Sequence, residues 1–247
     1  MSRALFAFPA GGGGGVSITP LAFNTIDLTT GYTKLEPDGM GYSVSIAGGV
    51  NTITFNALAT GDLKYAFSGS GAQWPRHYAD LNDADGTRLT TDDSFLMVVK
   101  LSNFTYPSAA DFRMAVGCCV DPTSTTTAAF DGYGIGRRLS NIGTAQEGHQ
   151  VYLDTTNGNT AGFTYDGADT ITGVITRTAQ RHAGNTVYGE LAGATAASAQ
   201  HTVKSTQALT ASQNWSLFIA LATTTSGTIS GGESVAFKAE YQVIRLR

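Results

Sequence analysis

The chain has 247 residues, which is enough to bury one sizeable hydrophobic core, and it carries a net charge of −4 at neutral pH. Hydrophobic residues make up 42% of it, but charged residues make up only 14%, well below the roughly 25% of average globular domains. The scattered Lys and Arg residues leave no basic stripe for direct nucleic-acid binding, and the two cysteines, Cys118 and Cys119, are too few for a disulfide-stapled scaffold.

The N-terminal residues 1–20 are expected to form an extended docking arm. A short apolar stretch ends at a proline and at the glycine tract Gly11–Gly15, so it is too brief for a signal peptide or a membrane span. We therefore expect synthesis in a cytoplasm and no contact with a membrane. Leu5, Phe6 and Phe8 are the expected interface residues of the arm. A neighbouring chain is the expected partner, and folding back onto its own domain is the alternative.

A hairpin is the clearest local unit after the arm. In the segment YSVSIAGGVNTITF, Gly48-Gly49 can supply the positive φ angles of a two-residue turn. This turn sets Val44 opposite Ile53 and Tyr42 opposite Phe55, with all four side chains on one face of the sheet.

A second hairpin is predicted in the segment VYLDTTNGNTAGFTY. Asn157-Gly158 favours a two-residue turn there, which places Tyr152 opposite Phe163. Continuous apolar runs are typical of central strands, and alternation is typical of strands with one wetted face. Patterns of these two kinds predict further strands at 95–99, 112–120, 215–221 and 235–247.

No window sustains a helical pattern of apolar residues for more than about two turns. Residues 191–200 are expected to form a loop or one short turn, and residues 121–129 an exposed loop, because their Pro and Thr residues offer nothing to bury. These patterns together predict that residues 21–247 form a single all-β domain, an antiparallel β-sandwich.

Five aspartates gather in the segment DLNDADGTRLTTDD, and clustered carboxylates are what a calcium site requires. Aligned with an EF-hand loop, three of them fall at ligand positions, but Leu81 occupies the first position and cannot supply a side-chain ligand. The segment from Asp80 to Asp93 is therefore expected to form a polar turn around Asp85 and Gly86. Calcium binding by this segment is left open as the alternative.

No other pattern indicates a catalytic, metal or cofactor site, so we expect no cofactor. The chain contains four histidines, His77, His149, His182 and His201. They lack the spacing of zinc ligands and are expected at the surface or at subunit contacts. Cys118 and Cys119 lie on a predicted strand, one pointing inward and the other outward, and are expected to be inert thiols. The glycines at 132–136 indicate a strand that passes close to another backbone.

Aromatic residues in or near predicted loops are the remaining candidates for a binding site. Trp74, Tyr78 and Tyr133 are candidate glycan contacts, because exposed Trp and Tyr rings stack on sugars. A sandwich of this size also uses most of its aromatic residues in its core, which is the competing interpretation.

Two resemblances follow from these segments. The succession DSFLMVVKLSNF, FRMAVGCCV, DGYGIGRR and HQVYLDTTNGNTAGFTY resembles the strand order of concanavalin-like jelly-roll sandwiches, over roughly residues 90–246. The small N-terminal arm and the low-charge body, rich in Gly, Thr and Asn, resemble virion proteins of tailed bacteriophages. The calcium and sugar ligands of the jelly-roll family have no matching motif in this chain.

The resemblance implies a non-enzymatic structural protein of a phage virion, which decorates the capsid or builds part of a tail, fibre or spike. Its expected partners are other virion proteins and copies of itself, with a homotrimer as the expected oligomer. The alternative is a lectin-like, carbohydrate-binding module that recognises a host surface glycan. A glycan hydrolase would need two carboxylates flanking a cleft, and the acidic residues of this chain are concentrated in one loop region instead.

Overall fold

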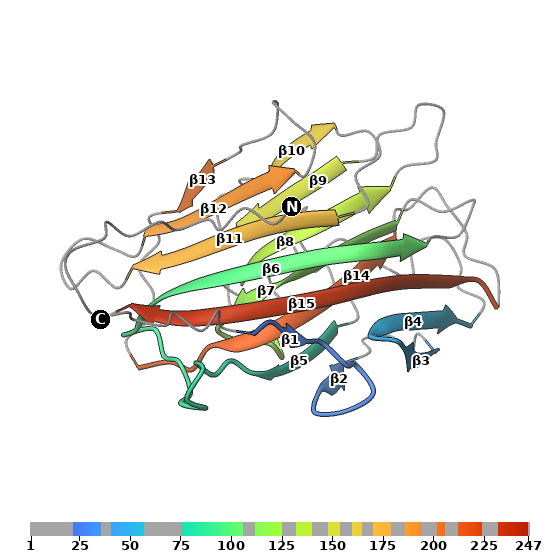
Figure 1. Cartoon of the computed structure of the whole chain (residues 1–247), viewed down its shortest axis with the longest axis horizontal. Coiled ribbons are helices and arrows are strands. Elements are labelled where there is room, and N and C mark those ends of the chain that lie inside the picture. Colours follow the sequence, from blue (N-terminus) through green and yellow to red (C-terminus); the bar gives the residue numbers. More distant parts are fainter. Residues whose placement is uncertain are drawn as a thin grey trace, which may run out of the picture.

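The structure is a computed structural model, and it describes residues 22–35, 41–56, 76–105, 112–124, 132–139, 148–153, 160–164, 170–178, 186–193, 202–205, 212–223 and 232–246. These residues form an antiparallel β-sandwich with the jelly-roll architecture that was predicted (Figure 1). Within them there is no helix, and hence none that could cross a membrane.

Sheet A contains eight of the described strands. Its order is β13 (Thr202–Ser205), β12 (Thr186–Gly193), β11 (Thr170–Thr178), β6 (Ser94–Thr105), β15 (Ser234–Leu246), β4 (Val50–Phe55) and β3 (Tyr42–Ala47), and β1 (Asn24–Thr25) also pairs with β15. The long strands β6 and β15 cross the middle of this sheet in Figure 1.

Sheet B contains seven of the described strands and lies behind sheet A in Figure 1. Its order is β10 (Thr160–Thr164), β9 (Gly148–Leu153), β8 (Gly132–Leu139), β7 (Phe112–Cys119), β14 (Ser216–Thr223), β5 (Arg76–Asp80) and β2 (Thr33–Leu35).

The main core lies between the two sheets and is built from alternate residues of their central strands. β6 and β15 supply it from sheet A, and β7 and β14 supply it from sheet B. Its fully buried members include Phe95, Met97, Val99, Val235, Phe237, Val116, Leu217 and Ile219. Burial of each such side chain contributes about 1.5–3 kcal/mol, so this row of apolar residues is the main source of stability.

The first hairpin is confirmed in pairing, register and turn. Tyr42 lies opposite Phe55 and Val44 opposite Ile53, and Gly48-Gly49 has φ angles of 58° and 79°. The predicted strand at the C-terminus is also confirmed, because its alternate residues from Val235 to Val243 face the core.

The second hairpin has the predicted pairing but a different register. Tyr152 lies opposite Thr160, and Phe163 lies opposite His149. The predicted register was wrong because the observed pairs centre on residue 156, whereas a two-residue turn at Asn157-Gly158 would centre them between those two residues. The shift of three residues exchanges the two faces of β10 relative to β9.

Two predicted loops are only partly within the described residues. The segment from Asp121 begins as a turn, in which the Asp121 carboxylate accepts hydrogen bonds from the amide and hydroxyl of Thr123 at 3.0 and 2.7 Å. Leu191–Gly193 ends strand β12, so the expected loop starts later than predicted. The arm 1–20, with Leu5, Phe6 and Phe8, lies outside the described residues.

Candidate functional site

The aspartate-rich segment 81–93 connects β5 of sheet B to β6 of sheet A. Leu81 and Leu89 are fully buried in the main core. Their backbones bond in a ring with Trp215: Leu89 N–H donates to the Leu81 carbonyl, Leu81 N–H to the Trp215 carbonyl, and Trp215 N–H to the Leu89 carbonyl. The segment is therefore fixed to Trp215, the residue before strand β14, by its backbone as well as by its apolar side chains.

The polar turn predicted around Asp85 and Gly86 is confirmed. Asp83 Oδ1 accepts hydrogen bonds from the backbone N–H groups of Asp85 and Thr87, at 3.1 and 2.9 Å. Gly86 has a φ of 78°, a conformation that residues with a side chain rarely adopt. Asp83 thus serves as the internal acceptor of the turn.

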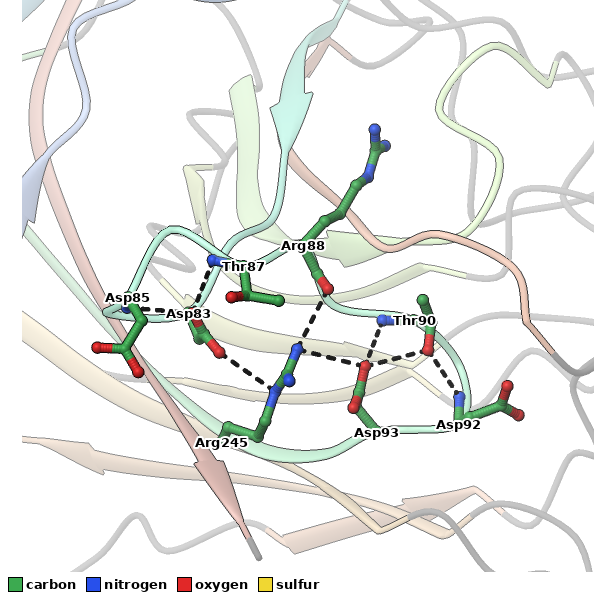
Figure 2. Close-up of polar contacts among 8 residues, drawn as sticks. All are labelled: Asp83, Asp85, Thr87, Arg88, Thr90, Asp92, Asp93 and Arg245. Atoms are coloured by element: carbon green, nitrogen blue, oxygen red, sulfur yellow. Dashed lines mark hydrogen bonds and ion pairs between the residues drawn. The ribbon is translucent and has the colours of Figure 1, made fainter.

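Arg245 of β15 is the centre of the polar contacts in this region (Figure 2). Its Nε lies 3.2 Å from Asp83 Oδ2, and its Nη2 lies 3.6 Å from Asp93 Oδ2 and donates to the Arg88 carbonyl at 3.2 Å. Asp93 Oδ2 also accepts from the backbone and hydroxyl of Thr90, at 2.8 and 3.0 Å. The guanidinium therefore ties both halves of the segment to the last strand.

Two of the other three aspartates have side-chain partners among the described residues, and the third, Asp85, has an exposed side chain. Asp92 accepts from the Ser212 hydroxyl at 2.7 Å, and Asp80 pairs with Arg88 at 2.6 Å. Among the described residues, no group of three or more His, Cys, Asp or Glu side chains is placed to share a metal ion. The geometry assigns these carboxylates to a structural turn and its anchoring.

A second polar cluster joins the two sheets at their β2 and β3 side. The Tyr42 hydroxyl lies 2.9 Å from His77 Nε2, and both side chains are buried. Lys34 Nζ lies 3.7 Å from the centroid of the Tyr42 ring and donates to the Tyr42 carbonyl at 2.7 Å. Burial, followed by the positive charge of Lys34, lowers the pKa of His77 to about 4.

His77 was expected at the surface or at a subunit contact, but its side chain is buried in the sandwich. Tyr42 gives its ring a hydrogen-bond partner inside the sandwich, which makes a buried histidine tolerable. His149 belongs to β9, while His182 and His201 lie outside the described residues.

Both cysteines are buried, although they lie on opposite faces of sheet B. Cys118 belongs to the main core, and Cys119 joins a smaller apolar cluster on the outer face with Ala115, Phe218 and Ala220. The expected arrangement, with one cysteine pointing inward and the other outward, is therefore confirmed, and the outward one is covered by its neighbours. Burial raises the pKa of Cys118 to about 12 and raises that of Cys119 well above its ordinary value, so both thiols stay protonated and unreactive at neutral pH.

The outer face of sheet B has room for large side chains because its central strands carry small ones. Gly134 of β8 lies opposite Gly117 of β7, and a Cβ at position 134 would lie 3.0 Å from Phe218 Cζ. The glycines were predicted to pass close to another backbone, but the nearest group to Gly134 is the Phe218 side chain. Arg76 donates from the same face to the Ser124 carbonyl, which brings the turn after β7 against this face.

The candidate glycan residues are not brought together among the described residues. Tyr78 is half-buried and packs against the outer cluster of sheet B. Tyr133 lies opposite Cys118 in the ladder, at a register position belonging to the other face of the sheet. Trp74 lies outside the described residues.

One buried cluster was missed by the sequence analysis. Arg177 of β11 is 1% exposed, its guanidinium carbon lies 5.5 Å from the Trp215 ring centroid, and it donates to the Thr91 carbonyl at 3.2 Å. Trp215 also packs edge-on against Phe95, with ring centroids 5.7 Å apart. An arginine in an alternating Thr-rich strand carries no sequence signal of such a position.

The outer edge of β3 is open in the described structure. Asn56 N–H donates to the Gly41 carbonyl at 2.8 Å, so the bonded pairs of this hairpin are the odd-numbered residues of β3. The N–H and C=O groups of Val44 and Ile46 therefore point away from β4. Lys34 bonds one outward group of this edge, the Tyr42 carbonyl, which confirms the direction. The whole hairpin, YSVSIAGGVNTITF, contains no charged residue.

No protein-family model matches the chain, and no curated protein matches it in sequence. Solved structures share its overall fold. They include the CBM2 module of the evolved Dit of Lactobacillus casei BL23 phage J-1, with a TM-score of 0.49 and 11% identity over 90% of this chain and 94% of that chain.

A legume lectin-like domain from Entamoeba histolytica has a TM-score of 0.47 and 12% identity, over 89% of this chain and 92% of that chain. A variant of alginate lyase Aly36B in complex with an alginate trisaccharide has a TM-score of 0.49 and 9% identity, over 92% and 95%. At these identities and TM-scores the similarity supports no inference about the role of this chain.

Proposed function

We propose that this chain is a non-enzymatic structural subunit of a bacteriophage virion, which decorates the capsid or forms part of a tail, fibre or spike. Its N-terminal arm docks it to other virion proteins and to copies of itself, in a homotrimer. The observation that carries the proposal is the edge of β3, a strand without charged residues whose outer side pairs with no other described strand.

An open edge favours a protein that works inside an assembly. A monomeric β-protein usually protects such an edge with charged residues or proline, because the free backbone groups pair with other chains. The β3–β4 hairpin has neither, and the chain as a whole is only 14% charged. Surfaces of this kind pack against neighbours with little desolvation of charge.

The acidic segment supports the non-enzymatic part of the proposal. Asp83 and Asp93 are engaged by backbone donors and by Arg245. A general acid or nucleophile would have to reach a substrate instead.

The proposal is tested by the mass of the full-length chain in solution, measured by light scattering after size exclusion. We expect a closed oligomer of three 25.7 kDa chains, and gold-labelled antibodies against the protein should label intact phage particles. A monomer at every concentration, together with unlabelled particles, would contradict the proposal.

A second candidate function is glycan binding on the virion surface. The observation that favours it is the outer face of sheet B, where the half-buried Tyr78 packs beside Phe218. Aromatic rings on a sheet face are suited to stacking on sugars. In a glycan screen, Tyr78→Ala should abolish any binding of the full-length protein while leaving its oligomer intact; unchanged binding would remove this face from consideration.

A further inference from the structure

We propose that the open edge of β3 receives residues 3–8 of a neighbouring copy as an added β-strand. The inference rests on the proposed function, since it identifies where the docking arm of one subunit binds on the next. Addition of an extended segment to a free sheet edge is a common mode of protein recognition, with affinity from backbone hydrogen bonds and specificity from alternate side chains.

The hydrogen-bonding capacity of the edge is defined by the register. Val44 and Ile46 each present one N–H and one C=O outward, and no described residue bonds these groups. Lys34 already occupies the outward carbonyl of Tyr42, so an added strand would lie along the hairpin toward Gly48. Four backbone groups are thus available to a strand of about four to six residues.

The side chains of β3 match an apolar guest. Val44 is half-buried and packs against the main core, and Ile46 on the same face is also half-buried, whereas Ser43 and Ser45 on the opposite face are exposed. A guest strand that places large apolar side chains beside Val44 and Ile46 would complete the sandwich at this side. The segment RALFAF of residues 3–8 carries Phe6 and Phe8 at such alternate positions, and Arg3 is its sole charged residue.

The direction of the chain favours the β3 edge of another copy over its own. Asn24 lies opposite Tyr241 and Thr25 opposite Glu240, so the chain before Asn24 runs toward the C-terminal end of β15. The hairpin carrying β3 pairs with the opposite end of β15, at 234–237. Traced backwards from Thr25, the first described residues therefore run away from the chain's own β3.

The Asn51 side chain fixes the backbone of Ile26 and Leu28, which follow the arm in the chain. Its amide donates to the Ile26 carbonyl at 2.7 Å, and its Oδ1 accepts from Leu28 N–H at 2.9 Å. Because this buried side chain belongs to β4, the point from which the arm departs is fixed relative to the hairpin that would receive a neighbour's arm.

The occupant of the edge is identified by cross-linking full-length variants. One variant carries Ala7→Cys, which in the proposed strand lies on the same face as Ser45 and leaves Phe6 and Phe8 intact, and a second carries Ser45→Cys. The two are mixed, allowed to exchange subunits and treated with a short bismaleimide. The native cysteines are buried and do not react. We expect a dimer band that contains both variants and is absent when either is treated alone.

Other occupants of the β3 edge would give different cross-linked products. A double variant carries both new cysteines in one chain. If it cross-links within the chain at low concentration, and the mixed single variants give no dimer, the arm folds onto its own β3. A dimer of Ser45→Cys alone would mean that two copies of β3 pair directly. Either result would overturn the inference.

A proline variant tests the backbone bonds themselves. Ile46→Pro removes an outward N–H that β4 does not use, while Ile46→Thr keeps it and serves as the matched control. We expect subunit association to weaken at least about tenfold in the first and to change less than about twofold in the second. An oligomer that survives Ile46→Pro unchanged would overturn the inference without touching the proposed function, which fails only if the native chain does not assemble.

Discussion

His77 makes the stability of the protein depend on pH between about 4 and 6.5. Burial in the sandwich and the charge of Lys34 lower its folded-state pKa to about 4, whereas an unfolded chain has a histidine pKa near 6.5. As the pH falls, the unfolded chain takes up this proton first. The contribution of neutral His77 to stability is therefore complete above pH 6.5, is lost progressively below it, and declines no further once the pH is below about 4.

The size of the effect follows from these two pKa values. The free energy of unfolding should fall by about 2 kcal/mol between pH 7.5 and pH 5, and by about 3 kcal/mol at pH 4, from this residue alone. Such a loss is a large fraction of the 5–15 kcal/mol that is typical of folded domains.

Urea unfolding at pH 7.5 and pH 5 measures the loss, and His77→Gln is the matched variant. Glutamine can still bond the Tyr42 hydroxyl but does not titrate, so the pH-dependent loss in this variant should be smaller by about 2 kcal/mol. Asp27 and Glu240 have lowered pKa values, and their effects cancel in the comparison because both proteins contain them. Equal losses in the two proteins would refute the assignment of the effect to His77.

Four further outcomes are expected from unfolding measurements. Asn51→Ala should cost about 2–4 kcal/mol, because it leaves a buried N–H and a buried C=O without their partner. Asp83→Ala should cost about 2 kcal/mol, whereas Asp85→Ala, which removes an exposed side chain, should change stability by less than about 0.5 kcal/mol. Gly134→Val should cost about 1–3 kcal/mol by colliding with the Phe218 ring, and Phe218→Leu in the same chain should recover part of that loss. Calcium should shift the thermal midpoint by less than about 1 °C, and a larger rise would show that the aspartate-rich segment binds the ion.

The sequence predicted those elements whose strand pairing depends only on nearby residues. The hairpin at 42–55 has a two-glycine turn, and its apolar residues alternate cleanly, so turn and face specify the same register. The hairpin at 148–164 differs, because Asn157-Gly158 is a strong turn signal but the observed pairs of β9 and β10 centre on residue 156 instead. Turn propensity alone therefore gave a register that was three residues out.

Contacts between distant parts of the chain could not be predicted in the same way. The aspartate-rich turn was expected, but its anchor, Arg245, lies more than 150 residues away and is one of several arginines that would suit. The same is true of Arg177, which reaches Thr91 across 86 positions of sequence. Such pairs depend on the order of strands in the sheets, and a single sequence does not determine that order.

The sequences of the four edge strands, two in each sheet, explain why the arm is a better partner for β3 than another edge strand would be. The edge strands β2 and β13 each contain a lysine, whereas β3 and β10 contain no charged residue. The contacts of β12 and β13 with β9 place β10 at the side of the sandwich opposite to β3. Direct pairing of β3 with the β10 of the next copy would be head-to-tail, and such contacts continue into fibres unless the rotation happens to close. An arm that fills β3 leaves that edge unable to pair in this way. Binding of the arm to the next copy is also head-to-tail, but the glycine tract at 11–15 constrains the rotation between subunits less than direct strand pairing does, so a small ring can close.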